Sequence, residues 1–285
     1  MPVQVGAWKG IVVRVDAGGA VPAPDRAVQG PRDAGDVVDA PQRIVSLVPS
    51  HTESLHDLGI KERVVGRTRF CIHPKPWVDY VTPVGGTKDA KLEKILALEP
   101  DLVVADKDEN PKALVDAIQE AGVEVLWSEI DAVPDAADFL EVLGERCGVP
   151  TAGHVAANQI RQGLERVAGA SPVPVWCPIW YDPWMTFDRT AYPHAMLAAV
   201  GLQNVFADHA GTKYFETTVD GVAATEAAWT LLPSEPYPFH DRQDKVDVAG
   251  LPPVRLIDGE ALTWFGTRTI TGLQVLAETA ASLQA

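Results

Sequence analysis

The stretch Arg43-Ile-Val-Ser-Leu-Val-Pro-Ser-His-Thr-Glu53 decides the fold, because it opens a regular alternation of strands and helices. Its apolar run, residues 44–48, is typical of a strand buried on both faces. Ser50 and Glu53 have the spacing of a capping box, which predicts that a helix starts here. Gly59 marks the expected end of that helix.

The alternation continues as far as residue 127. Asn110 is expected to cap a helix that has a proline in its first turn and ends at Gly122. These elements describe one doubly wound α/β lobe. We expect further strands at residues 63–66, 102–105 and 123–127, and a helix at residues 92–98.

A helical region follows, interrupted by Gly148-Val-Pro150, and the strand–helix pattern then resumes. The sequence therefore predicts an α/β fold with two Rossmann-like α/β lobes joined by a long backbone helix. In the second lobe we expect strands at residues 173–180 and 254–257 and helices at residues 192–200, 222–232 and 269–283. The predicted organisation is an N-terminal arm or hairpin (1–42), an N-terminal lobe (43–133), a helical linker (134–169) and a C-terminal lobe (170–285).

The composition of the 285 residues argues against several classes of binding partner. With a net charge of -15, the surface repels phosphate backbones, so nucleic acid is not an expected partner. The sequence shows no apolar run long enough for membrane insertion, and the first thirty residues show no secretory signal. As written, the chain is expected to be cytoplasmic; if its native start was trimmed, it is extracytoplasmic. The three cysteines do not suggest a disulfide framework.

Two segments resemble the class III, helical-backbone periplasmic binding proteins, which include cobalamin and iron-siderophore receptors. They are residues 43–53 and the stretch Val84-Gly-Gly-Thr-Lys-Asp-Ala-Lys-Leu-Glu-Lys-Ile-Leu-Ala-Leu-Glu-Pro-Asp-Leu-Val-Val-Ala105. The resemblance implies a ligand cleft between the two lobes. It also implies that one acidic residue per lobe docks on the permease of an ABC importer. Glu93 matches the first position, and Glu226, on a helix before Pro233, matches the second.

In the first lobe, the candidate ligand-binding residues follow the predicted strands, where open α/β sheets bind ligands. A helix N-terminus favours anionic or carbonyl groups, and Arg69 suits a carboxylate or phosphate. An arginine in such a loop can also simply pair with a nearby acid. Phe70 falls where the cobalamin receptor has an aromatic residue, and Asp106 falls where it has a tryptophan. The candidates are His51, Thr52, Arg69, Phe70, Cys71, His73 and Asp106.

In the second lobe, aromatic residues crowd the loops after strands and predict a stacking wall for a ligand. The same rings could instead cover the core. The candidates are Trp180, Tyr181, Trp184, Tyr192, His194, Tyr237 and Trp264.

The leading hypothesis is a solute-binding protein that holds a small ligand, most simply a corrinoid or another metal-bearing organic molecule such as a haem-like ring. No cofactor is required, and no nucleophile-elbow, P-loop or dinucleotide motif indicates an enzyme. The alternatives are a cytosolic cofactor-handling enzyme or a regulatory binding module on the same fold. A direct metal-ion receptor built from His51, His73, His194 and Asp106 is a further alternative.

Overall fold

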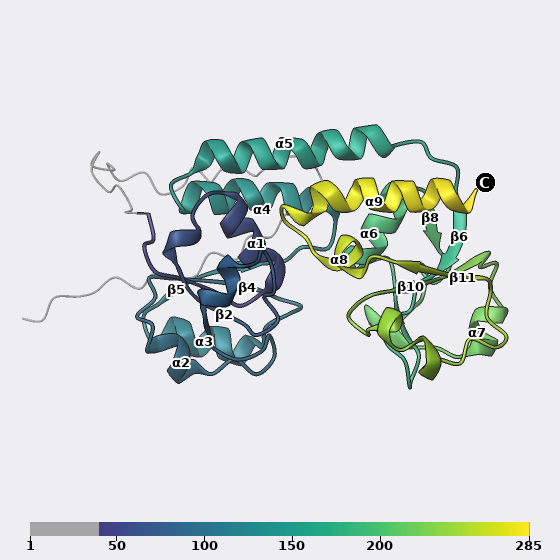
Figure 1. The fold of residues 1–285 in the computed structure, drawn as a ribbon, viewed down its shortest axis with the longest axis horizontal. Helices are drawn as coiled ribbons and strands as arrows, with labels where there is room; N and C mark the ends of the chain where they lie inside the picture. Colours follow the sequence, from purple (N-terminus) through teal and green to yellow (C-terminus); the bar gives the residue numbers. More distant parts are fainter. Residues whose placement is uncertain (1–39, 285) are drawn as a thin grey trace, which may run out of the picture. The chain divides into compact units, whose positions relative to one another are not determined.

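A computed structural model of the chain describes residues 40–284 (Figure 1). The described chain falls into two compact units. Unit 1 comprises residues 40–129 and Glu141–Gly153, and unit 2 comprises Ile130–Leu140 and residues 154–284. Apart from residues 40–42, the predicted N-terminal arm lies outside the described residues.

Unit 1 is built on a five-stranded parallel sheet with the order β3-β2-β1-β4-β5. The helices α2 and α3 cover one of its faces (Figure 1). The strands are β1 (Ile44–Ser46), β2 (Val64–Arg67), β3 (Thr82–Pro83), β4 (Leu102–Asp106) and β5 (Glu124–Ser128). The helices are α1 (Pro49–Asp57), α2 (Leu92–Leu96) and α3 (Lys112–Glu120), with short 3-10 turns at Lys61–Arg63 and Trp77–Tyr80.

The core of unit 1 follows from the pleat of the strands. Val45, Val103 and Val125 lie on one face of the sheet, because they occupy the same register on neighbouring strands. They pack into one cluster with Ile95 of α2 and Ile118 of α3, all of them buried. This burial is the main force that holds the two helices on the sheet.

Unit 2 contains a four-stranded parallel sheet with the order β11-β10-β6-β8, and a two-stranded antiparallel sheet of β7 and β9. The helices α6, α8 and α9 lie together on one side of the larger sheet (Figure 1). The strands are β6 (Val173–Trp176), β7 (Met185–Phe187), β8 (Leu202–Asn204), β9 (Tyr214–Glu216), β10 (Trp229–Pro233) and β11 (Val254–Ile257). The helices are α6 (Tyr192–Ala199), α7 (Val219–Ala223), α8 (Gly259–Thr263) and α9 (Arg268–Leu283), with 3-10 turns at Phe239–Asp241 and Gln243–Lys245.

Two further helices, α4 (Val133–Arg146) and α5 (Pro150–Val167), are each divided between the units. The predicted interruption between them is confirmed: Gly148 adopts a φ of 72° and Pro150 begins the 18-residue α5. None of the helices that the structure describes is long and apolar enough to cross a bilayer.

The two predicted helix caps are wrong. Helix α1 begins at Pro49 rather than after Ser50, and its N-cap is Val48, which is extended at φ -137° and ψ 136°. A proline fixes a helical φ and disfavours helical geometry in the preceding residue, so it sets the start of the helix here. Helix α3 likewise has Pro111 as its N-cap, and the side chain of Asn110 is used elsewhere.

The helix predicted at residues 222–232 is also wrong. Helix α7 ends at Ala223, and β10 pairs with β6 on one side and β11 on the other. The backbone hydrogen bonds of a central strand and the burial of its apolar residues outweigh the local helical pattern. Glu226, expected on that helix, is an exposed residue in the irregular segment between α7 and β10. The strand predicted at residues 173–180 is shorter and ends at Trp176.

Candidate functional site

Each unit has one point at which the strand order reverses. In unit 1 the chain runs from β1 outward to β3 and then returns across β1 to β4. In unit 2 it runs from β6 to β8 and returns across β6 to β10. Loops leave the sheet in opposite directions at such a point, so the crevice beyond the strand ends is where α/β sheets bind ligands. The loops after β1 and β4, and after β6 and β10, are therefore the candidate sites.

In unit 1 this point is filled by a buried chain of polar side chains. His51 Nε2 lies 2.8 Å from Ser128 Oγ, and Ser128 Oγ donates to Asp106 Oδ2 at 2.6 Å. Asn110 extends the chain: its Oδ1 accepts from Asp106 N–H, and its Nδ2 donates to the carbonyl oxygens of Leu47 and Thr87. Each of these four polar side chains is almost completely buried. The network joins the ends of β1, β4 and β5.

Burial sets the charge of this network. Desolvation lowers the pKa of His51 to about 3, so its imidazole is neutral at physiological pH. Desolvation raises the pKa of Asp106 to about 7, against the opposing effect of its bond from Ser128. Burial thus disfavours the charged form of both groups, and the carboxyl group of Asp106 titrates near physiological pH rather than well below it.

Thr52 and Cys71 form a second buried group. Thr52 Oγ1 lies 2.8 Å from Ser46 Oγ and 3.0 Å from Cys71 Sγ, and Cys71 Sγ lies 3.1 Å from Thr68 Oγ1. Desolvation raises the pKa of the Cys71 thiol, so it is not poised as a thiolate. The candidates His51, Thr52, Cys71 and Asp106 are therefore interior groups that shape the strand ends.

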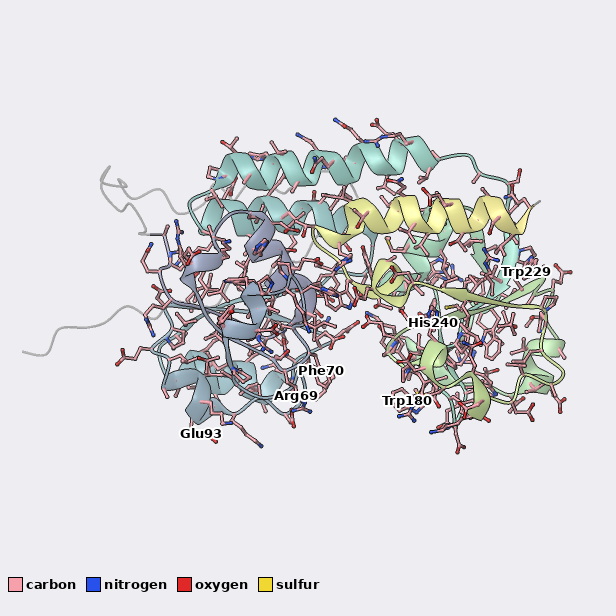
Figure 2. The ribbon with its side chains drawn as sticks, in the orientation of Figure 1. Arg69, Phe70, Glu93, Trp180, Trp229 and His240 are labelled. Atoms are coloured by element: carbon pink, nitrogen blue, oxygen red, sulfur yellow. The ribbon has the colours of Figure 1, made fainter. Side chains whose placement is uncertain are left out.

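The exposed candidates of unit 1 are Arg69 and Phe70, which lie beside each other (Figure 2). The Arg69 guanidinium carbon is 4.7 Å from the centroid of the Phe70 ring, which is 49% exposed. Arg69 Nη1 also bonds Asp89 Oδ1 at 2.9 Å, and Asp89 accepts the backbone N–H of Gly86 at 2.6 Å. The loop after β2 is thereby tied to the glycine loop after β3. His73, further along the first loop, is half-buried.

In unit 2 the aromatic residues of the loops after β6 and β10 pack against one another. The Trp180 ring, 45% exposed, meets the buried Tyr237 ring edge-on at a centroid distance of 5.4 Å. Tyr181 contacts Trp184 at 4.7 Å, and Trp184 stacks on Phe239 at 5.9 Å. The inner rings therefore build core, as the second interpretation expected, whereas Trp180 is partly exposed and its stacking on a ligand stays a prediction. Figure 2 places Trp180 and His240 at one end of the unit and Trp229 at the other.

The remaining candidates of unit 2 are tied to neighbouring helices. Tyr192 Oη bonds Thr269 Oγ1 at 2.7 Å, joining α6 to α9, and burial raises the pKa of Tyr192. His194 is half-buried, and desolvation lowers its pKa. The indole N–H of the buried Trp264 donates to Glu235 Oε1. Glu235 is not among the residues predicted from the sequence. Its position between Pro233 and Pro236, directly after β10, could have pointed to it.

The buried Ser, His and Asp of unit 1 do not have the order of a hydrolase triad. Ser128 stands in the middle and bonds both partners, whereas a triad needs the histidine between the serine and the acid. Among residues 40–284, no group of three or more His, Cys, Asp or Glu side chains is arranged to hold a metal ion.

A family model described as periplasmic binding protein matches residues 44–231, from β1 to the middle of β10. That match covers well over half of the chain. The chain belongs to the periplasmic binding protein family. The family is periplasmic, and its members are binding proteins rather than enzymes.

Several relatives carry more specific names. The vitamin B12-binding proteins of Yersinia pestis (strain Pestoides F) and Yersinia pseudotuberculosis serotype O:3 (strain YPIII) are each 27% identical over 173 residues, which is 59% of this chain. The match spans only 61% of the length of those relatives.

Solved structures show the same fold. The periplasmic vitamin B12 binding protein BtuF of Vibrio cholerae has a TM-score of 0.76 at 21% identity, covering 86% of this chain and 98% of that one. The periplasmic heme-binding protein RhuT from Roseiflexus sp. RS-1 has a TM-score of 0.75 at 22% identity, covering 86% and 99%.

Proposed function

We propose that this chain is a solute-binding receptor of an ABC importer, and that it reversibly binds a corrinoid or haem-like ring in the extracytoplasmic space. The relatives named for vitamin B12 and the fold shared with a heme-binding protein support this assignment. The interlobe cleft stays a prediction of the sequence.

The observation that carries the proposal is the exposed Trp180 ring set on Tyr237, from the loops after β6 and β10. A large flat ring gains most from an apolar face that is already rigid, because little side-chain entropy is lost on binding. The contacts among Tyr237, Tyr181 and Phe239 hold that face in place. In unit 1, Phe70 offers a second exposed ring backed by Arg69.

Titration with cyanocobalamin and with hemin, followed by tryptophan fluorescence and by the melting temperature, tests the proposal. We expect the melting temperature to rise with one or both rings, because a ligand that binds only the folded state stabilises it. Trp180→Ala should weaken binding about tenfold. Trp229→Ala is the matched control, since Trp229 lies at the other end of unit 2 (Figure 2). If no corrinoid or haem compound shifts either signal, the ligand assignment is wrong.

Docking on a permease is the second part of the proposal. Glu93 is exposed on α2, as predicted, and Figure 2 shows it apart from Arg69 and Phe70. Glu226 is also exposed, although it lies on no helix. Charge reversal at each residue, Glu93→Lys and Glu226→Lys, should reduce association with an ABC permease and leave ligand affinity unchanged. Unchanged association in the double variant would remove this docking role.

A further inference from the structure

The buried amide group of Asn110 ties three loops of unit 1 together. Its Oδ1 accepts from the backbone N–H of Asp106, the last residue of β4, at 2.9 Å. Its Nδ2 donates to the carbonyl oxygen of Leu47, directly after β1, at 3.2 Å, and to that of Thr87, after β3, at 3.0 Å. The side chain is only 3% exposed, so water does not compete for these bonds. With both donors and its oxygen engaged, the amide is held in one orientation.

The carbonyl group that Asn110 bonds after β3 lies in the middle of the glycine loop, residues 85–89. Both ends of this loop contact Arg69. Gly85 O accepts the backbone N–H of Arg69 at 2.7 Å, and Asp89 Oδ1 accepts from Arg69 Nη1 at 2.9 Å. Because its ends hold Arg69 and its middle is bonded to Asn110, the loop connects these two residues by direct contacts.

The Arg69 side chain is the last link, and it leads to Phe70. Its guanidinium carbon lies 4.7 Å from the centroid of the exposed Phe70 ring. An exposed ring that is not held in place loses rotamer freedom when a ligand binds, and that loss lowers affinity. The conformation of Phe70 therefore depends on Arg69, on the glycine loop and, through that loop, on Asn110.

We propose that Asn110 is a positioning residue for ligand binding: by fixing the glycine loop, it holds Phe70 in the conformation that contacts a corrinoid or haem-like ring. The inference rests on the proposed function, because it takes Phe70 as a residue that touches the ligand. Asn110 itself is buried and acts only through Phe70. Asn110→Ala removes both donors, so the carbonyl groups of Leu47 and Thr87 lose a buried partner and the glycine loop is released.

A double-mutant cycle with Phe70→Ala tests this role, with cyanocobalamin and hemin as the probes. For a ring that binds, Asn110→Ala should weaken binding about fivefold when Phe70 is present. In Phe70→Ala it should change affinity by less than about twofold, because the side chain that it positions is already absent. Fluorescence titration gives the dissociation constants, at a temperature at which each variant is folded. If Asn110→Ala does not fold, Asn110→Ser, which keeps one hydroxyl donor, takes its place.

Asn204→Ala is the matched control. Asn204 is also 3% exposed, and its amide group donates to Phe187 O at 2.9 Å and accepts from the N–H of Phe206 at 3.0 Å. All three residues belong to unit 2, whereas Phe70 belongs to unit 1. Any effect of Asn204→Ala on affinity should therefore be the same with and without the Phe70 ring. A general loss of stability would act alike in both asparagine variants, so only positioning separates them.

A measurement without ligand follows Phe70 directly. In protein labelled with fluorophenylalanine, the fluorine NMR resonance of Phe70 is assigned by its loss in Phe70→Leu. This resonance should shift or broaden in Asn110→Ala and stay unchanged in Asn204→Ala.

Two binding results would overturn the inference and leave the proposed function standing. One is an affinity of Asn110→Ala equal to that of the wild type, and the other is a loss of equal size with and without the Phe70 ring. If neither probe binds, the proposed function is wrong, and the fluorine spectra decide whether Asn110 positions Phe70. Identical Phe70 resonances in the wild type and Asn110→Ala would then overturn the positioning role as well.

Discussion

His51 Nε2, in the first turn of α1, lies 2.8 Å from Oγ of Ser128, the last residue of β5. The contact is buried and joins residues 77 positions apart. Through Ser128 it reaches Asp106 at the end of β4, so one serine holds an imidazole and a carboxyl group. These buried side chains therefore link helix α1 to the ends of β4 and β5.

The free energy of unfolding should depend on pH through the shifted pKa values of His51 and Asp106. His51 has a folded pKa of about 3 against an ordinary 6.5, so the unfolded chain binds more protons between these values and stability rises with pH. Asp106 has a folded pKa of about 7 against 3.8, so its contribution falls as the pH rises through that range. The two effects oppose each other.

Asp106→Asn removes only the second effect. The stability of this variant relative to the wild type should therefore rise from pH 4 to pH 7, by up to about 4 kcal/mol. Urea denaturation at a series of pH values measures the difference. A difference that is constant over the range would show that Asp106 is not buried as a neutral acid.

Ser128→Ala should destabilise unit 1 by about 1–3 kcal/mol, because two buried polar groups lose their shared partner. Ser171→Ala is the matched control: Ser171 is exposed, and its change should stay within about 0.5 kcal/mol. Chemical denaturation compares the two. Equal values for both variants would mean that the network contributes nothing to stability.

Gly86→Ala should weaken ligand binding several-fold with little loss of stability. A Cβ there would lie 2.5 Å from Asp89 Oδ1 and 2.8 Å from the guanidinium carbon of Arg69. Both atoms lie at the ends of flexible side chains, so they can move away from the added methyl group. That movement disturbs the ion pair between Arg69 and Asp89, which holds Arg69 beside Phe70. A fluorescence titration beside a thermal melt separates the two effects. Unchanged affinity would place this loop outside the binding surface.

Gly259→Ala should cost about 1–3 kcal/mol, because its Cβ would meet the backbone of Glu235 at 2.4 Å and 2.7 Å, and backbone cannot move as a side chain can. In Gly211→Ala, the control, the nearest atom is 3.2 Å away in the exposed side chain of His209. Differential scanning calorimetry compares the two variants. A melting temperature equal to that of the control would show that the loop after β10 relaxes freely.

The sequence by itself determined most of the architecture. Apolar runs such as residues 44–48, punctuated by glycines at 59, 122, 148 and 201, fixed the alternation of strands and helices, since both signals act over a few residues. The exposure of Glu93 also followed from helical spacing alone.

Only the tertiary structure decided the rest. The segment before Pro233 became a strand because β6 and β11 pair with it on both sides. His51 and Asp106 became buried partners of Ser128, and Glu235 became the acceptor for Trp264. Each of these outcomes depends on residues more than twenty positions apart, and long-range burial and pairing are not written in local periodicity.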